Sequence, residues 1–281
     1  MILTPAAAIP ESRVVVVSPH FDDLPCMLGG WLLAMRDSGE LAARRIEVLL
    51  VFSRSNYTAR AGEANYDASP ERIREVSGIR LSEDCACLDE LLGAHGYRYE
   101  LGLEDECLVR GNKLTDSAFE FPHGVYEDFA AADWAILERL EGRLGELLGM
   151  EDTAVVVPAA YREHRDHFLV REAARRARAL ASREGRLRAS IYYPEDKPYA
   201  GLADEAERSR VSAFARDEGL VELAFAVDPK SVAALVRSHY PSQYEAIYET
   251  GILEASRRAA MDYGSATPLD RMLAYPGPAS P

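Results

Sequence analysis

The sequence has little cysteine and lacks any long hydrophobic run. Four of its 281 residues are cysteine, and no C-x-x-C pair occurs among them, so neither a disulfide framework nor a zinc ribbon is indicated. No apolar run approaches the roughly 20 residues needed to cross a bilayer. Residues 1–12 lack the basic start and apolar core of a signal peptide. We therefore expect free thiols and a cytoplasmic protein.

Positive charge is also scarce. The chain has 32 Lys and Arg against 46 Asp and Glu, a formal net charge of -14. Such a surface repels phosphate backbones and anionic lipid at long range, so neither nucleic acid nor a membrane is an expected partner. There is no G-x-G-x-x-G phosphate loop. Gly29-Gly30 falls inside a helical pattern, which favours close packing or room near a site over nucleotide binding.

What the sequence does contain is short apolar runs alternating with amphipathic stretches. This pattern predicts one α/β domain with a mostly parallel sheet that is covered by helices on both faces. We expect the domain to span 1–265 and a Pro-, Gly- and Ser-rich tail to span 266–281. The predicted strands are 14–18, 46–53, 97–101, 153–157, 189–193 and 220–227, and the predicted helices are 28–38, 70–92, 128–148, 166–184, 231–239 and 243–263.

Two clusters of His and Asp follow two of the predicted strands. Residues 19–23 (PHFDD) come directly after strand 14–18, and residues 164–167 (HRDH) follow strand 153–157. Ligands of parallel α/β sheets bind at the carboxyl ends of the strands. A catalytic zinc site takes three N or O ligands and keeps a position for water. The two clusters therefore predict a metal at one sheet edge, to which two His and one Asp contribute.

The paired aspartates suggest a division of labour. Asp22 and Asp23 are adjacent on a tight turn and cannot easily reach the same atom, so one can bind metal while the other acts as a general base. The alternative is structural: Asp22, Asp23 or Asp166 could each be the N-cap of the helix that follows it.

These motifs, in this order, resemble those of the PIG-L/LmbE-like zinc deacetylases. Residues 18–23 with Gly29-Gly30 resemble the opening motif of the family, and residues 164–167 its His-x-Asp-His motif. Residues 80–84 (RLSED), 91–93 (LLG) and 101–105 (LGLED) look like the Arg-x-x-Glu-Asp helix of the family and the strand–Asp loop that follows it. Residues 193–199 (YPEDKPY) and 240–243 (YPSQ) look like later landmarks of one branch of the family, so that the resemblance spans about residues 13–245.

The resemblance implies a Rossmann-like fold and a mononuclear Zn2+ site that hydrolyses an N-acetyl group of an N-acetylglucosamine-type amino sugar, free or within a larger metabolite. Its positions imply the following roles: His20, Asp23 and His167 as zinc ligands, Asp22 as general base, His164 as oxyanion stabiliser or proton shuttle, Asp166 as the residue that orients His164, and Arg80 and Asp105 as contacts to substrate hydroxyls.

One position departs from the pattern. Many members have Glu after the Asp pair, where this chain has Leu24; other members carry an apolar residue there, so the metal site need not be lost. Two alternatives stay open: an amidase that cleaves another amide of a sugar conjugate, and a metal-binding protein without turnover. We expect a small neutral or cationic amino sugar as the partner, with segments 54–70 and 193–243 on opposite sides of its pocket. A homo-oligomer is left open.

Overall fold

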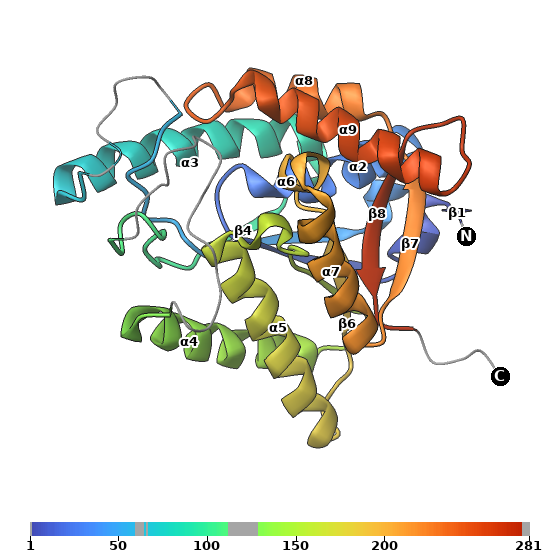
Figure 1. Ribbon diagram of the computed structural model, residues 1–281, viewed down its shortest axis with the longest axis horizontal. Helices are drawn as coiled ribbons and strands as arrows, with labels where there is room; N and C mark the ends of the chain where they lie inside the picture. Colours follow the sequence, from blue (N-terminus) through green and yellow to red (C-terminus); the bar gives the residue numbers. More distant parts are fainter. Residues whose placement is uncertain (1, 60–64, 66, 112–128, 277–281) are drawn as a thin grey trace.

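The computed structural model describes residues 2–59, 65, 67–111 and 129–276 (Figure 1). Within these ranges eight strands form one sheet, in the order β1-β7-β8-β6-β5-β2-β3-β4. All neighbouring pairs are parallel except the two that involve β8. The strands are β1 (Ile2–Leu3), β2 (Arg13–Ser18), β3 (Arg45–Leu50), β4 (Arg98–Leu101), β5 (Thr153–Val156), β6 (Ser190–Pro194), β7 (Val221–Ala226) and β8 (Leu269–Ala274).

Helices cover both faces of this sheet, as Figure 1 shows. Helices α2, α3 and α8 pack on one face, and α4, α5, α6 and α7 contribute to the apolar layer on the other. The helices are α1 (Pro5–Ala8), α2 (Asp23–Asp37), α3 (Pro70–Leu92), α4 (Ala131–Leu148), α5 (Arg165–Arg183), α6 (Tyr199–Leu202), α7 (Glu205–Asp217), α8 (Pro229–His239) and α9 (Ala246–Asp262).

Strand β2 shows why a β-branched run suits the sheet centre. Val14 and Val16 pack into the layer of α2 and α3, whereas Val15 and Val17 pack into the layer of α4 and α5. Side chains of a strand alternate between the two faces, so a strand covered on both is apolar throughout. The predicted α/β class with helices on both faces is confirmed.

The sequence prediction was wrong at several elements, and the largest error lies near the C-terminus. The predicted tail begins at 266, but Leu269–Ala274 form β8, which inserts between β6 and β7 inside the sheet. Helix α7 was not predicted. Helix α2 begins at Asp23 rather than at 28. The predicted helix 128–148 begins at Ala131, and residue 128 lies outside the described ranges.

The topology fixes where a site can form. Strands β2 and β5 are parallel neighbours, with Val16 opposite Val156. From β2 the sheet continues through β3 to β4, and from β5 it continues to β6 on the other side. A crevice opens where the strand order reverses in this way, at the carboxyl ends of the two strands. Both His/Asp clusters leave the sheet at this point. Among the described residues every helix is too short or too polar to cross a membrane.

Candidate metal centre

The first cluster is a hydrogen-bonded turn between β2 and α2. The Ser18 hydroxyl donates to the His20 carbonyl at 2.8 Å, and the His20 amide donates to Asp23 Oδ2 at 2.8 Å. These bonds hold the His20 ring over the end of the strand. The Asp23 carboxylate, in the first turn of α2, also lies near the positive end of that helix.

His20, Asp23 and His167 bring their potential ligand atoms within 4.8 Å of one another, and all three residues are buried. Asp23 Oδ2 lies 3.0 Å from His20 Nδ1 and 3.1 Å from His167 Nε2. The buried His167 Nε2 makes no hydrogen bond despite this proximity. An unsatisfied imidazole nitrogen facing a carboxylate and a second imidazole fits a divalent metal bound between them.

Each of these histidines also has a carboxylate at its other ring nitrogen. His20 Nε2 lies 2.9 Å from Asp166 Oδ2, and His167 Nδ1 lies 2.8 Å from Asp196 Oδ2. Carboxylates in this position fix the ring orientation and raise the basicity of a metal-binding imidazole. Sequence reasoning missed Asp196. It follows strand β6 at the same sheet edge, so the rule that ligands bind at the carboxyl ends of parallel strands (the strand-end rule) applied to it as well.

The electrostatics favour a cation here. Burial opposes charge on His20, but its hydrogen bonds to Asp166 and Asp23 outweigh burial and raise the pKa of His20 to about 10. His167 follows the same pattern: burial lowers its pKa, while Asp23 and Asp196 raise it to about 9. The carboxylates that favour two cationic imidazoles favour a divalent cation between them as well.

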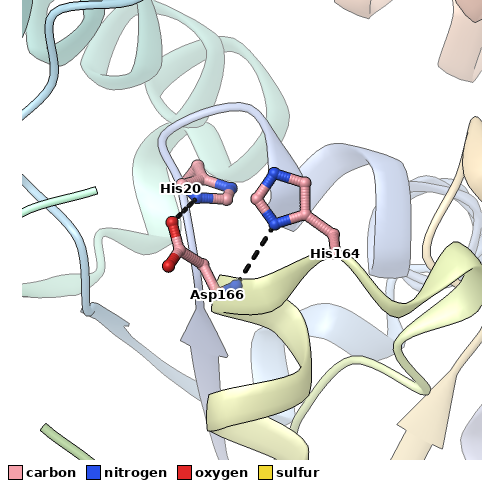
Figure 2. A group of neighbouring side chains, drawn as sticks. All are labelled: His20, His164 and Asp166. Carbon is pink, nitrogen blue, oxygen red and sulfur yellow. Dashed lines mark hydrogen bonds and ion pairs between the residues drawn. The ribbon is translucent and has the colours of Figure 1, made fainter. Parts of the chain in front are cut away.

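His164 has a different environment, which Figure 2 shows. Its Nδ1 accepts the Asp166 backbone N–H at 3.3 Å at the start of α5. Burial and the neighbouring His167 and His20 hold the pKa of His164 well below its usual value. The ring is therefore neutral and carries its proton on Nε2, which makes that nitrogen a hydrogen-bond donor.

The segment before His164 has unusual backbone geometry. Ala160, Arg162 and Glu163 all have positive φ angles between 51° and 59°. Left-handed conformations are strained for residues with a Cβ, and they persist where the surrounding structure enforces them, often at functional sites. Here the turn delivers His164 to the metal centre from the end of β5.

Asp166 contacts His164 through its backbone N–H, so its predicted role of orienting His164 stays a prediction. It is not the N-cap of α5, because His164 holds that position. Its carboxylate accepts from His20, from the Cys107 amide at 3.0 Å and from Arg110 at 2.7 Å. His20, His164 and Asp166 form a second possible ligand group. We favour the Asp23 group, because donors already occupy the carboxylate of Asp166.

Asp22 stands beside the ligand group without joining it. It makes no side-chain cap bond to α2. Its Oδ1 accepts from Arg80 at 3.0 Å, and its Oδ2 accepts from the Tyr248 hydroxyl at 3.2 Å. The two adjacent aspartates thus point to different partners, as the division into ligand and base requires.

The two predicted substrate contacts differ in placement. Arg80 lines the pocket, but it is 3% exposed and its guanidinium is bonded to Asp22, Glu106 and Ser55. The carboxylate of Asp105 pairs with Arg54 at 3.0 Å and is not part of the pocket lining, whereas the next residue, Glu106, is. Contact of Arg80 and Asp105 with substrate stays a prediction.

Two landmarks of the family resemblance contact each other. Glu83 on α3 accepts the amide and hydroxyl of Ser242, and the neighbouring Asp84 accepts the hydroxyl of Tyr240 at 2.7 Å. These bonds tie segment 240–243 to α3 and thereby place Gln243 in the pocket wall. The two distant motifs therefore belong to one structural unit.

The pocket over the metal centre is lined by both predicted segments. Tyr57 comes from segment 54–70, while Tyr199, Gln243 and Tyr248 come from the later part of the chain. The sequence analysis included Tyr57, Tyr199 and Gln243 only as members of segments 54–70 and 193–243. It missed Tyr248 and Glu106. The full lining is His20, Asp22, Asp23, Tyr57, Arg80, Glu106, Cys107, Leu108, His164, Tyr199, Gln243 and Tyr248.

No protein-family model and no curated protein matches this chain. Solved structures do. Teicoplanin deacetylase Orf2 in a zinc-inhibited form aligns over 95% of this chain and 100% of its own, with 21% identity and a TM-score of 0.61. The A40926 pseudoaglycone deacetylase Dbv21 aligns over 95% and 100%, with 20% identity and a TM-score of 0.52.

A third similar structure comes from Pyrococcus horikoshii. The N,N'-diacetylchitobiose deacetylase of Pyrococcus horikoshii, in complex with an inhibitor, aligns over 98% of this chain and 87% of its own, with 13% identity and a TM-score of 0.52. At these identities the likeness establishes the fold. The resemblance to the PIG-L/LmbE-like deacetylases is therefore confirmed at that level: the chain has the fold of these deacetylases.

Proposed function

We propose that the protein is a Zn2+-dependent hydrolase that removes an N-acetyl group from an N-acetylglucosamine-type amino sugar, free or within a larger metabolite. The observation that carries this proposal is the convergence of His20, Asp23 and His167, two of them held by carboxylates, beside a further carboxylate on Asp22. The fold shared with enzymes described as deacetylases of teicoplanin, of a pseudoaglycone and of diacetylchitobiose supports the same reaction.

Zinc at this site would supply an acidified water and a Lewis acid for the amide carbonyl. Asp22 accepts a proton from the attacking water as a general base, since its carboxylate faces the pocket and is not one of the three ligands. The Nε2–H of neutral His164 donates to the oxygen on which negative charge develops. The proton on Asp22 then passes to the leaving nitrogen, so that water is added across the C–N bond to give acetate and a free amine.

The lining favours a substrate without negative charge near the amide. The arginine that lines the pocket, Arg80, already forms ion pairs with Asp22 and Glu106. An anionic substituent would therefore meet carboxylates without a compensating guanidinium. Tyr57, Tyr248 and Gln243 instead offer hydroxyl and amide groups, which suit the hydroxyls of a sugar.

The test combines metal analysis with an amine-release assay on N-acetylated amino sugars, acetanilide and N-acetylated peptides. We expect one zinc per chain. Asp22→Asn should keep the metal and lose about 10²–10⁴-fold in kcat, the usual size of a general-base contribution. Asp23→Asn should lose metal affinity. The matched control is Asp37→Asn, at the exposed end of the same helix, which should change neither.

Each alternative has its own outcome. If Asp22→Asn lost the metal and Asp23→Asn kept it, the two roles are reversed. Zinc binding without release of any amine would favour a metal-binding protein without turnover. Turnover of another amide of a sugar conjugate, with no release of acetate from any N-acetyl sugar, would favour the amidase.

A further inference from the structure

Strand β8 begins at the sheet edge where β6 ends, because it runs antiparallel to β6 and β7. Leu273 pairs with Tyr193 and Met272 with Pro194, so the first residues of β8 lie beside the segment that leaves the carboxyl end of β6. The Glu195 amide continues this ladder and donates to the Arg271 carbonyl at 3.2 Å. The last strand of the chain is thus attached to the segment that carries Asp196.

Two consecutive residues of β8 bind the two neighbours of Asp196. Asp270 Oδ1 lies 2.6 Å from Lys197 Nζ, and both side chains are almost fully buried. Arg271 donates through Nε and Nη2 to Glu195 Oε1 at 3.0 and 2.6 Å. Successive side chains of a strand point to opposite faces, so segment 195–197 is held from both sides of the sheet. We call these two contacts the β8 clamp.

Each half of the clamp is further anchored. Asp270 Oδ1 also accepts the Ser256 hydroxyl at 2.8 Å, and Arg271 also pairs with Asp262 at 2.7 Å, so both residues are tied to α9. Gly30 of α2 lies against Asp270 so closely that a Cβ there would be 2.5 Å from Oδ2. Two helices, α9 and α2, therefore contact the clamp.

Between the two halves lies Asp196, which is fully buried. Its Oδ1 accepts the Tyr161 amide at 3.0 Å, and its Oδ2 lies 2.8 Å from His167 Nδ1. No direct bond joins Asp196 to β8 among the described contacts. Its orientation toward His167 therefore depends on the Tyr161 amide and on the backbone of 195–197, which the clamp holds.

We propose that Asp270 and Arg271 are positioning residues of the metal centre: the β8 clamp sets the Asp196–His167 contact and thereby the metal affinity. This inference rests on the metal site of the proposed function. Partners of metal-binding histidines contribute about 10–100-fold to metal affinity or activity. A clamp that merely stabilised the fold would change the unfolding free energy but not the metal affinity of the folded protein.

The test measures Zn2+ affinity of the full chain by competition with a chromogenic chelator, on protein shown to be folded by circular dichroism. Asp196→Asn should bind zinc about 10–100-fold more weakly. Asp270→Asn and Arg271→Gln should each weaken zinc binding, up to the loss seen for Asp196→Asn. In the Asp196→Asn background they should add little, because the contact through which they act is already lost. The matched control is Arg257→Gln, which removes an exposed ion pair of α9 with Glu254.

Two results would overturn the clamp: unchanged zinc affinity in the folded β8 variants, or losses that add in full to that of Asp196→Asn. If Asp270→Asn does not fold, the decision falls to Arg271→Gln, whose side chain is 14% exposed. Absence of zinc binding by the unmodified protein would instead show that the metal site of the proposed function is wrong. Unchanged zinc affinity in Arg257→Gln would show that a loss in Arg271→Gln does not come from the removal of arginine charge in general.

Discussion

The carboxyl group of Asp84 makes the stability of this protein depend on pH in a way that a single variant can isolate. Asp84 lies on α3, is 2% exposed and accepts the hydroxyls of Tyr99 and Tyr240. Burial raises the pKa of Asp84 to about 7, although both tyrosines act against this rise. The unfolded chain would show the ordinary value of 3.8.

The sign and size of the change in unfolding free energy with pH follow from the linkage between proton binding and folding. Below pH 4 the group is protonated in both states and favours neither. Between pH 4 and pH 7 the unfolded state releases its proton while the folded state keeps it, so the free energy of unfolding falls with rising pH. A difference of roughly three pKa units at 1.36 kcal/mol each gives a loss of up to about 4 kcal/mol, complete above pH 7.

Asp84→Asn removes this titration. Urea unfolding of both proteins at pH 4.5, 6 and 8 should show the stability of the variant, relative to the unmodified protein, rising by about 3 kcal/mol across the series, because part of the loss already occurs below pH 4.5. Groups common to both proteins cancel in this difference. Tyr99→Phe is the control: it removes a hydrogen bond that lowers the pKa, and should move the window to higher pH. A difference that does not vary with pH would refute the reasoning.

Three further variants test the site and the packing around β8. Tyr248→Phe removes the donor to Asp22 Oδ2; kcat should fall about 10–100-fold, from about 1.5–3 kcal/mol for a hydrogen bond to a charged group, with zinc content by elemental analysis unchanged. Gly30→Ala places a Cβ 2.5 Å from Asp270 and 2.8 Å from Val227; urea unfolding should show a loss of about 1–3 kcal/mol. Asp105→Ala should lower kcat/KM for an N-acetyl sugar more than for acetanilide, and equal losses would assign Asp105 to its pairing with Arg54 alone.

The parallel core of the fold could be predicted because its strands carry their own signal. The run 14–17 is apolar throughout, as a strand covered on both faces must be, and Pro70 with Gly93 marks the ends of α3. Strand β8 carries no comparable signal. Leu269–Ala274 contain Asp270 and Arg271 at buried or nearly buried positions, and these charges are tolerated only because Lys197 and Glu195 face them. Partners more than seventy residues away cannot be read from a local pattern.

The candidate site shows the same limit. The strand-end rule is local, and it finds the donors His20, Asp22, Asp23, His164 and His167. It does not find which nitrogen of each imidazole faces the metal, because that depends on Asp166 and Asp196 at the other nitrogen. The rule also cannot tell which of the adjacent residues Asp105 and Glu106 lines the pocket. The loop conformation decides this: Glu106 lines the pocket, and Asp105 pairs with Arg54.

The charge balance around the ligands explains why the centre suits a divalent cation. Five carboxylates are buried in the ligand group, its partners and the pocket wall: Asp22, Asp23, Glu106, Asp166 and Asp196. The guanidiniums of Arg80 and Arg110 form ion pairs with three of them, Asp22, Glu106 and Asp166. Buried negative charge in such excess is costly unless cations compensate it. The raised pKa values of His20 and His167 are one expression of this demand. A divalent cation held by Asp23 and both neutral imidazoles meets the same demand with a single ion, and it leaves Asp22, bound to Arg80 and Tyr248, outside the ligand set.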